Sequence, residues 1–381
     1  MEPTSPRSQL AQLSKQELLR ALVPTETLGG ERVFRDGRQL WNFASNDYLG
    51  LASHPTVATA YIEGIKRFGA GASASRLVTG SSPAHQHLEE TLSEAKHAEA
   101  ALTFTSGFST ALSVIPIVAE KGDFIVLDKL AHASLIDASR ISEATLRVFP
   151  HNNTAKLAQL LAKIRAKHAG ARILVVTESV FSMDGDLCPL REILDLCEEF
   201  SALLLLDEAH AIGVLGQTGM GLAEALGVQS RIHFQMGTLS KAVGLSGGYL
   251  AADREWIDLI INRARPFIYT TAPPPALLHA ASAAIELIRS GEGKALREKL
   301  FKNISQLRQG HPSAIIPMIL GENRITLDAS CALEDAGFLI PAIRFPTVPR
   351  NTARLRITVS AGHSLDTVKK LSDQLSQILK G

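Results

Sequence analysis

Short apolar runs alternate with helix-like stretches through the middle of the chain, and this alternation constrains the fold more than any other feature. Runs that are apolar on both faces suit the strands of a parallel sheet covered by helices. They occur at residues 101–105, 124–127, 146–149, 173–177, 203–206, 233–236 and 249–252, with helix-like stretches at 87–98, 155–167 and 190–200. Alternation of this kind favours right-handed crossover connections. The sequence therefore predicts an α/β fold whose large domain is built on a mostly parallel sheet.

The pattern changes near Thr271, where three consecutive prolines at 273–275 interrupt regular structure. Helix-like segments then follow at 276–309, 323–336 and 365–379, and strand-like runs at 314–320 and 354–359. This order indicates a smaller α+β domain. We therefore expect an N-terminal segment at 1–45, a large domain at 46–270 and a small C-terminal domain at 271–381.

The composition argues against several classes of protein. The 381 residues carry a formal net charge of +1, which gives no electrostatic reason to expect a nucleic acid or an anionic membrane as partner. The three cysteines, Cys188, Cys197 and Cys331, form no CxxC pair, so we expect no metal site and no disulfide framework. Residues 1–20 lack the apolar core of a signal peptide, and no apolar run approaches the roughly 20 residues that span a bilayer. We expect a cytoplasmic protein.

The segment LLLLDEAH at 203–210 places an acid directly after a buried strand. Asp207 then lies at the carboxyl end of that strand, where open α/β sheets bind ligands. The simpler interpretation of an isolated aspartate at this position is a helix cap. The letters DEAH also occur in nucleotide-driven helicases, but those proteins need a phosphate loop of the type GxxxxGKS or GxxxxGKT, which this sequence lacks. Asp207 is therefore a candidate ligand-binding residue.

Lys241 follows the strand-like run at 233–236 and precedes a glycine-rich stretch at 244–248. Most lysines are solvated surface groups, but a partly desolvated lysine at a strand end can form an imine with a ligand. Asp207 and Lys241 together suit pyridoxal 5′-phosphate (PLP). The PLP aldehyde needs a lysine, and its ring nitrogen stays protonated beside a carboxylate. The two residues together predict a PLP enzyme that acts on an amino acid.

Further candidates follow other predicted strands. Residues 105–110 follow one strand and open a helix, so they suit a phosphate group, although Ser106 could equally be an ordinary helix cap. Thr238 offers a second hydroxyl. His132 could stack on a ligand ring, and His210 could hydrogen-bond a ligand oxygen, although a single histidine is more often structural. We expect the other histidines of this part of the chain, His85, His87 and His97, to lie at the surface.

The glycine-rich segment at 69–76, GAGASASR, raises the alternative of a dinucleotide-binding fold. That fold requires a strand before the glycines, a helix after them and a third glycine. Here a helix-like stretch precedes the segment and the third glycine is absent. The sequence therefore argues against a dehydrogenase.

Many segments match one family in order along the chain: NFASNDYLGL (42–51), GAGASASRLVTG (69–80), SGF (106–108), LAHASL (130–135), ESVFSMDGD (178–186), LLLLDEAH (203–210), GTLSKAVG (237–244), YTTAPPP (269–275) and ARLRIT (353–358). The chain resembles the α-oxoamine synthases, which are fold-type-I (aspartate aminotransferase-like) PLP enzymes. The segment at 342–358, together with Ser75, is similar to the branch that condenses L-alanine with a pimeloyl thioester in biotin biosynthesis.

The resemblance implies a role for each matching residue. Lys241 would hold PLP as a Schiff base and carry the α-proton, Asp207 would pair with the ring nitrogen, and His132 would stack on the ring. The other implied cofactor contacts are Gly107, Phe108 and Thr238, mostly at the phosphate, and Ser182 and His210 at the phenolic oxygen. The implied substrate contacts are Arg356 at the amino-acid carboxylate, Asn46, His132, Arg20 and Thr347. Glu208 departs from the DDAH common in the family. We expect it to face away from the cofactor and to matter little.

The implied reaction is a decarboxylative Claisen-type condensation of L-alanine with pimeloyl-CoA or pimeloyl-acyl carrier protein. The family also implies a homodimer with the active site at the interface, where Thr270 or Thr271 would reach the neighbour's phosphate. Other activities stay open. They are glycine C-acetyltransferase (2-amino-3-ketobutyrate CoA ligase) or another α-oxoamine synthase, a PLP aminotransferase, and a PLP-binding protein without catalytic activity.

Overall fold

The computed structural model describes residues 5–29 and 31–378. Residues 1–4 of the predicted N-terminal segment and Leu379, at the end of the last predicted helix, lie outside the described residues. The chain forms two compact units. The first unit gathers the described residues up to Asn46, Met183–Gly185 and the described residues from Leu300 onward, and the second holds Asp47–Ser182 and Asp186–Lys299. The division into domains at 1–45, 46–270 and 271–381 stays a prediction.

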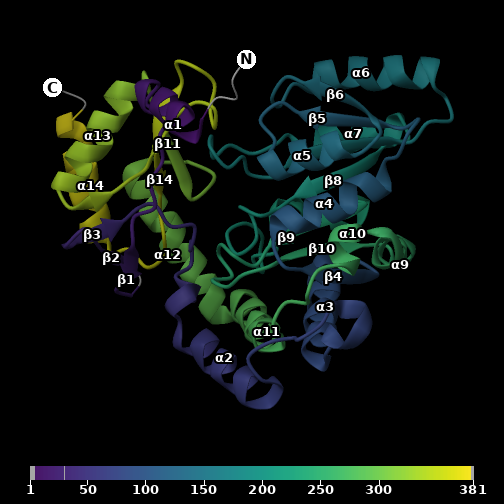
Figure 1. Ribbon diagram of the computed structural model, residues 1–381, viewed down its shortest axis with the longest axis horizontal. Helices are drawn as coiled ribbons and strands as arrows, with labels where there is room; N and C mark the ends of the chain where they lie inside the picture. Colours follow the sequence, from purple (N-terminus) through teal and green to yellow (C-terminus); the bar gives the residue numbers. More distant parts are fainter. Residues whose placement is uncertain (1–4, 30, 379–381) are drawn as a thin grey trace. The chain divides into compact units, whose positions relative to one another are not determined.

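A seven-stranded sheet forms the centre of the second unit, with strand order β4-β10-β9-β8-β7-β5-β6 (Figure 1). Its strands are β4 (Ala100–Phe104), β5 (Phe124–Asp128), β6 (Thr145–Phe149), β7 (Ile173–Glu178), β8 (Leu203–Asp207), β9 (Phe234–Thr238) and β10 (Gly248–Ala252). β10 runs antiparallel to both of its neighbours, β4 and β9, and the other neighbouring strands of this sheet pair in parallel. Each predicted strand of this region overlaps an observed one, and the prediction of a mostly parallel sheet is confirmed.

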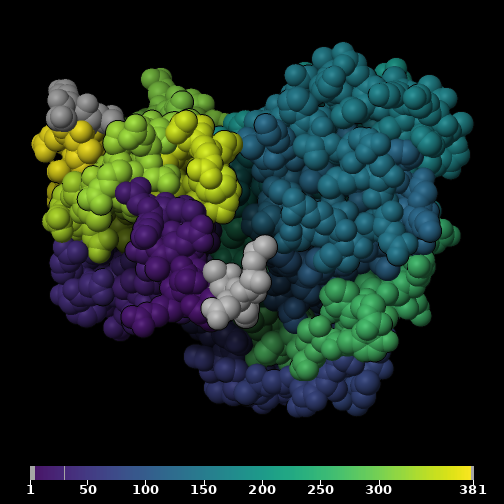
Figure 2. All heavy atoms as spheres, turned by 45° about the horizontal axis from the view of Figure 1, so that its top comes forward, coloured from purple at the N-terminus to yellow at the C-terminus, as the bar shows by residue number. Residues whose placement is uncertain are grey.

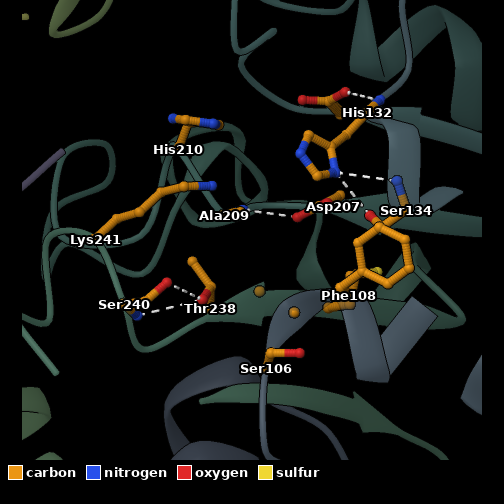
Figure 3. Close-up of a pocket in the computed structure, with 14 residues that line it drawn as sticks. Ser106, Phe108, His132, Ser134, Asp207, Ala209, His210, Thr238, Ser240 and Lys241 are labelled. Atoms are coloured by element: carbon orange, nitrogen blue, oxygen red, sulfur yellow. Dashed lines mark hydrogen bonds between the residues drawn. The ribbon is translucent and has the colours of Figure 1, made fainter. Parts of the chain in front are cut away.

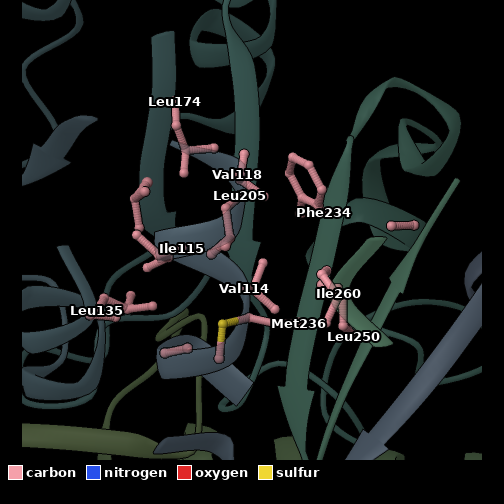
Figure 4. Packing of buried hydrophobic residues seen from close by; sticks show 14 of the residues in the cluster. Val114, Ile115, Val118, Leu135, Leu174, Leu205, Phe234, Met236, Leu250 and Ile260 are labelled. Carbon is pink, nitrogen blue, oxygen red and sulfur yellow. The ribbon is translucent and has the colours of Figure 1, made fainter. Parts of the chain in front are cut away.

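Apolar side chains of this sheet alternate between two buried faces, as they do in strands that are covered on both sides. In β8, Leu205 packs into a core with helices α4 (Gly107–Val118), α5 (Ala133–Ile141), α9 (Arg254–Arg263) and α10 (Arg265–Ile268), part of which Figure 4 shows. Leu204 and Leu206 point into a second core with α6 (Thr154–Lys167), α7 (Leu190–Glu199) and α8 (Leu222–Leu226). The four leucines before Asp207 therefore fix β8 between two helical layers.

The second unit also contains α2 (Pro55–Phe68), α3 (Pro83–Lys96) and α11 (Pro275–Arg289), and α12 (Gly291–Leu307) follows α11. Gly64 allows α2 and α11 to approach closely, because a Cβ at that position would lie 2.8 Å from the Ala276 Cα. In the space-filling view, the dark-blue α2 forms the lower rim of this unit (Figure 2). One prediction was wrong here. His85 is fully buried in the first turn of α3, where its Nδ1 lies 2.9 Å from the Ser82 hydroxyl oxygen.

The first unit contains two smaller sheets. One has the order β1-β2-β3-β12, with strands Thr25–Thr27, Arg32–Arg35, Arg38–Asn42 and Phe338–Leu339, and the other has the order β11-β14-β13, with strands Ile315–Gly321, Ala353–Thr358 and Ala342–Ile343. Its helices include α1 (Pro6–Lys15), α13 (Asn323–Asp335) and α14 (Leu365–Ile378). The predicted strands at 314–320 and 354–359 correspond to β11 and β14. No helix in the described part of the chain is long and apolar enough to cross a membrane.

Candidate active site

A pocket of about 240 Å³ lies at the carboxyl ends of the parallel strands of the second unit (Figure 3). Its lining residues come from the ends of β7, β8 and β9, from the loops that follow β4, β5, β8 and β9, and from the first turns of α4 and α5. They are Ser106, Gly107, Phe108, His132, Ser134, Glu178, Asp207, Ala209, His210, Met236, Gly237, Thr238, Ser240 and Lys241. This edge of an open α/β sheet is where ligands bind in such folds.

Asp207, the last residue of β8, and Lys241, in the loop after β9, both line this pocket. The Asp207 side chain is buried, and its Oδ1 accepts a hydrogen bond from the Ala209 backbone N–H at 2.9 Å. Burial raises the pKa of Asp207, and the positive charge of Lys241 opposes that rise. In Figure 3 the Lys241 side chain points into the pocket. The site therefore combines a buried carboxylate with an amine that can approach a ligand.

His132 caps the N-terminus of α5 and is held at both its ring and its backbone. Its Nδ1 lies 2.8 Å from the Ser134 hydroxyl oxygen and accepts the Ser134 backbone N–H at 3.2 Å. Its backbone N–H donates to Glu178 Oε1 at 2.5 Å. Partial desolvation lowers the pKa of His132 below its usual value of 6.5, so the ring is neutral near pH 7. A neutral, oriented imidazole suits stacking on a flat ligand ring.

Glu178 is an acidic residue of the pocket to which the sequence-based predictions assign no role. It ends β7, pairs in register with Asp207 of β8, and is almost completely buried. Burial and the neighbouring Asp207 raise the pKa of Glu178 well above its ordinary value. The signal that identified Asp207, an acid directly after a buried strand, was also present at Glu178.

The N-terminus of α4 and the hydroxyl of Thr238 line another part of the pocket. Ser106 caps this 12-residue helix by accepting the Ser109 backbone N–H at 3.0 Å. Thr238 Oγ1 lies 2.7 Å from Ser240 Oγ and donates to the Gly247 carbonyl at 2.8 Å. A Cβ on Gly107 would lie 3.5 Å from the Thr238 Cβ, so the start of α4 lies directly against Thr238. A capped helix N-terminus with nearby hydroxyl groups suits an anion such as phosphate.

The structure brings seven of the eight predicted cofactor contacts to this pocket and leaves one outside. The seven are Gly107, Phe108, His132, Asp207, His210, Thr238 and Lys241. Ser182 is buried, but it is not among the residues that line the pocket. The roles of all eight stay predictions.

The remaining predicted substrate contacts form two hydrogen-bonded pairs in the first unit. Arg356, buried on β14, donates from Nη1 to Asn46 Oδ1 at 3.1 Å and to the Thr358 hydroxyl at 2.9 Å. Arg20 Nη2 donates to Thr347 Oγ1 at 3.5 Å. The second pair lines a hollow of about 260 Å³ that also includes Arg344. Two arginines at one hollow suit a carboxylate or another anion.

Glu208 lies away from the pocket, as expected, but it is not a surface residue. Glu208 and Lys96 are fully buried and form an ion pair with each other. In addition, among the residues described, His, Cys, Asp and Glu side chains form no group of three that could hold a metal ion.

Comparison with known proteins places this geometry in a family. Residues 38–375 match the model of the family described as aminotransferase class I and II. An 8-amino-7-oxononanoate synthase from Maricaulis maris is 47% identical over 378 residues, covering 98% of this chain and 95% of the relative. The synthase from Geobacter sulfurreducens is 42% identical, with coverage of 98% and 97%.

Solved structures agree with the sequence relatives. A structure of SPT with a PLP internal aldimine has a TM-score of 0.92 and 26% identity, covering 98% of this chain and 96% of that one. A serine palmitoyltransferase from Sphingomonas wittichii has a TM-score of 0.91 and 29% identity, with the same coverage. These findings confirm the family resemblance and the fold class that the sequence predicts. The chain therefore belongs to the aminotransferase class I and II family, and it is similar to 8-amino-7-oxononanoate synthases over nearly its whole length.

Proposed function

We propose that the chain is a PLP-dependent acyltransferase that condenses L-alanine with a pimeloyl thioester. The products would be 8-amino-7-oxononanoate, CO2 and the free acyl carrier, in biotin biosynthesis. Relatives of 42–47% identity over nearly the full chain support this reaction over the glycine C-acetyltransferase and aminotransferase alternatives. The main observation behind the proposal is that Lys241 and the buried Asp207 line the same pocket.

The residues of the pocket fit PLP in five places. Lys241 supplies the amine that the aldehyde needs, and the buried Asp207 carboxylate suits a protonated ring nitrogen. The capped N-terminus of α4, with Gly107 and the Thr238 hydroxyl beside it, suits the phosphate. His132 would cover the face of the ring, and His210 would donate to the phenolic oxygen. This donor set matches the cofactor group by group.

When bound, PLP supplies an electron sink for the negative charge that develops at the amino-acid Cα. Lys241 removes the Cα proton and later returns a proton, which requires its amine to be neutral during part of the cycle. Asp207 remains ionised and holds the proton on the ring nitrogen, while Arg356 binds the amino-acid carboxylate. His132 limits the position of the reacting atoms. We propose these roles for Lys241, Asp207, Arg356 and His132 individually.

The assembly that we propose is a cytoplasmic homodimer with the active site at the interface. The second unit exposes large apolar side chains, with Leu77 at 53%, Val78 at 74% and Tyr269 at 69% of their full accessibility. Neighbouring exposed apolar groups, unlike scattered ones, mark interaction sites, and the bridge between Ser75 and Thr271 brings the segments that carry these three residues together. Thr270 and Thr271, next to Tyr269, line a small depression with Arg76, which supports a contribution of this region to a neighbouring subunit's phosphate site.

Product analysis tests the function directly. The purified protein is incubated with PLP, L-alanine and pimeloyl-CoA, and the product is identified by mass spectrometry while thiol release is followed with a thiol reagent. We expect 8-amino-7-oxononanoate and one free thiol for each product molecule. Pimeloyl-acyl carrier protein in a parallel reaction identifies the preferred carrier. Turnover only with glycine and acetyl-CoA, or keto-acid formation without thiol release, would favour one of the alternative activities.

A further inference from the structure

A buried tyrosine outside the pocket contacts one of the residues that line it. Tyr48 is fully buried, and its hydroxyl oxygen lies 2.5 Å from Nδ1 of His210. The two rings are tilted by 45°, with centroids 6.1 Å apart. His210 lines the pocket together with Lys241, and Figure 3 labels both residues. The contact therefore links Tyr48, which does not line the pocket, to His210, which does.

A Tyr48 hydroxyl that donates to Nδ1 selects one form of the His210 ring. A phenol has an ordinary pKa of about 10, so a tyrosine hydroxyl keeps its proton near neutral pH. A neutral imidazole has one N–H and one acceptor nitrogen, and a donor placed at Nδ1 leaves the proton on Nε2. Fixing the tautomer through the nitrogen that faces away from the ligand is how proteins orient histidines at reactive sites. Tyr48 thus leaves Nε2–H as the donor that His210 can present to the pocket.

Hydrogen bonds within the turn at 47–52 fix the backbone on both sides of Tyr48. Asp47 accepts the backbone N–H groups of Leu51 and Ala52 at 2.8 and 3.1 Å, and the Asp47 carbonyl accepts the Gly50 N–H at 3.1 Å. Gly50 has the positive φ of 76° that this tight turn requires. Three backbone groups are therefore satisfied within the turn at 47–52, which holds the Tyr48 side chain in place.

The same turn packs against the segments that carry Lys241 and His210. A Cβ on Gly244 would lie 2.4 Å from the Ala52 nitrogen, so the loop after Lys241 lies directly on the turn. A Cβ on Gly213 would lie 3.3 Å from Leu49 Cδ1 and 2.5 Å from the Ala242 Cβ. The turn at 47–52 therefore supports both sides of the pocket end where His210 and Lys241 lie.

We infer that Tyr48 is a positioning residue, whose hydroxyl fixes His210 with Nε2–H available to the phenolic oxygen of bound PLP. This inference rests on the proposed use of PLP. Donation to that oxygen favours the form of the bound cofactor that carries more negative charge on it. Loss of the Tyr48 hydroxyl therefore raises the pH at which the bound cofactor loses its proton. It also slows the chemical step, while alanine binding is unchanged because Tyr48 does not line the pocket.

The first test uses the wild-type holoenzyme, labelled with 15N-histidine and observed by NMR. We expect His210 to carry its proton on Nε2 and to have an unprotonated Nδ1. A neutral His210 with its proton on Nδ1 would overturn the inference. This measurement needs no substitution, so it decides the question even if a variant fails to fold.

The second test compares Tyr48→Phe with Tyr249→Phe, in which another fully buried tyrosine, which lies beside Lys96 and is not among the residues that line the pocket, loses its hydroxyl. In Tyr48→Phe, the pH midpoint of the cofactor's visible absorption should rise by about one pH unit, the size expected for one hydrogen bond to a charged oxygen. The kcat should fall about tenfold, with the alanine KM within about twofold of wild type. Tyr249→Phe should match wild type. A midpoint in Tyr48→Phe equal to that of wild type would contradict the inference.

A double-mutant cycle then asks whether Tyr48 acts through His210. In a His210→Asn background, Tyr48→Phe should shift the midpoint no further. Additive shifts would show that Tyr48 acts by another route. The absorption titration uses neither alanine nor a thioester. A failure of the proposed reaction in the product assay is therefore distinguishable from a failure of the proposed role of Tyr48.

Discussion

Asp207 and Glu208 are consecutive acids at the end of β8 with different surroundings. Asp207 lines the pocket, where its carboxylate accepts one backbone hydrogen bond, from Ala209, and lies close to the charge of Lys241. Glu208 is fully buried away from the pocket, where it accepts from the Lys96 amine and, at 3.0 Å, from the Ala223 backbone N–H. Lys96 also donates to the Met220 carbonyl at 2.7 Å. Because successive residues of a strand point to opposite faces, one strand end serves both environments.

The different surroundings indicate that Asp207 contributes to reactivity and Glu208 to stability. Burial raises the pKa of Asp207, and its carboxylate lines a pocket where it can accept further hydrogen bonds from a ligand. A perturbed pKa in a pocket is typical of a functional residue. Burial alone would lower the pKa of Lys96, but Glu208 raises it instead, so Lys96 stays charged. Both members of the Lys96–Glu208 pair also bond the backbone. We expect substitutions on the pocket side to change chemistry, and substitutions on the other side to change folding.

The largest effect should come from Lys241→Ala. Turnover should fall at least about a thousandfold, because the variant loses both the cofactor link and the proton carrier. Steady-state assays and the visible absorption of the bound cofactor measure this loss. Lys163→Ala, on the exposed face of α6, is the matched control and should behave as wild type. Normal turnover in Lys241→Ala would refute the role of this lysine.

Lys96→Met should destabilise the protein by about 3–5 kcal/mol, because it leaves the Glu208 carboxylate buried without its counter-ion. Urea unfolding of the cofactor-free protein measures the free energy. The double variant Lys96→Met with Glu208→Leu should recover much of the loss, since an apolar pair avoids the uncompensated charge. A single variant as stable as wild type would mean that the ion pair contributes little to the fold. That result would support the original expectation that Glu208 matters little.

Asp207→Asn should have the opposite profile, with a kcat about a hundredfold lower and little loss of stability. An asparagine Oδ1 can still accept the Ala209 N–H, and the neutral amide removes the desolvation penalty of a buried charge. It cannot hold a proton on a ligand nitrogen as a carboxylate does. Steady-state kinetics with urea unfolding of the same preparation gives both values. A loss of stability without a loss of kcat would place Asp207 with Glu208 as a structural acid.

The pocket side was more accessible to sequence reasoning than the other side. Asp207 and Lys241 follow apolar runs that predict strands, and the carboxyl ends of parallel strands meet at one edge. Local sequence carries no comparable sign for Lys96, because only the tertiary fold brings the end of α3 to Glu208. Tyr48 is similar, since its partner His210 is distant in the chain.

Element boundaries show the same dependence on tertiary contacts. The long apolar strands of the second unit were predicted, whereas β1 at Thr25–Thr27 is short and fully exposed, so it lacks the apolar pattern that identifies a strand. His85 was placed at the surface because no set of acidic or thiol groups accompanies it in the local sequence, yet its ring turns back to the Ser82 cap at the start of α3. Local pattern therefore predicts the strands and the acids that end them, but not which polar side chains the fold encloses.

The smallest effect concerns a half-buried cluster of charged residues, which is neither part of the pocket, like Asp207, nor fully enclosed, like Glu208. His151 lies 3.1 Å from Asp128 Oδ1 through Nδ1 and 2.9 Å from Asp186 Oδ2 through Nε2. Burial alone would lower the pKa of His151, but hydrogen bonds to these two carboxylates raise it to about 10. A raised folded-state pKa means that the stabilisation is complete below the ordinary value of 6.5 and is lost as the pH rises to about 10. Because solvent screens this cluster, we expect a loss of about 1 kcal/mol or less.

Unfolding of wild type and His151→Gln at several pH values between 6.5 and 10 measures this contribution. Glutamine has no charge to lose, so the variant should be less stable than wild type at the lower end of the range, and the two proteins should converge at the upper end. The kcat should change little, because His151 does not line the pocket. Parallel pH profiles for the two proteins would show that the ion pairs of His151 add nothing to stability. The Lys96–Glu208 pair would then be the better guide to how buried charges stabilise this unit.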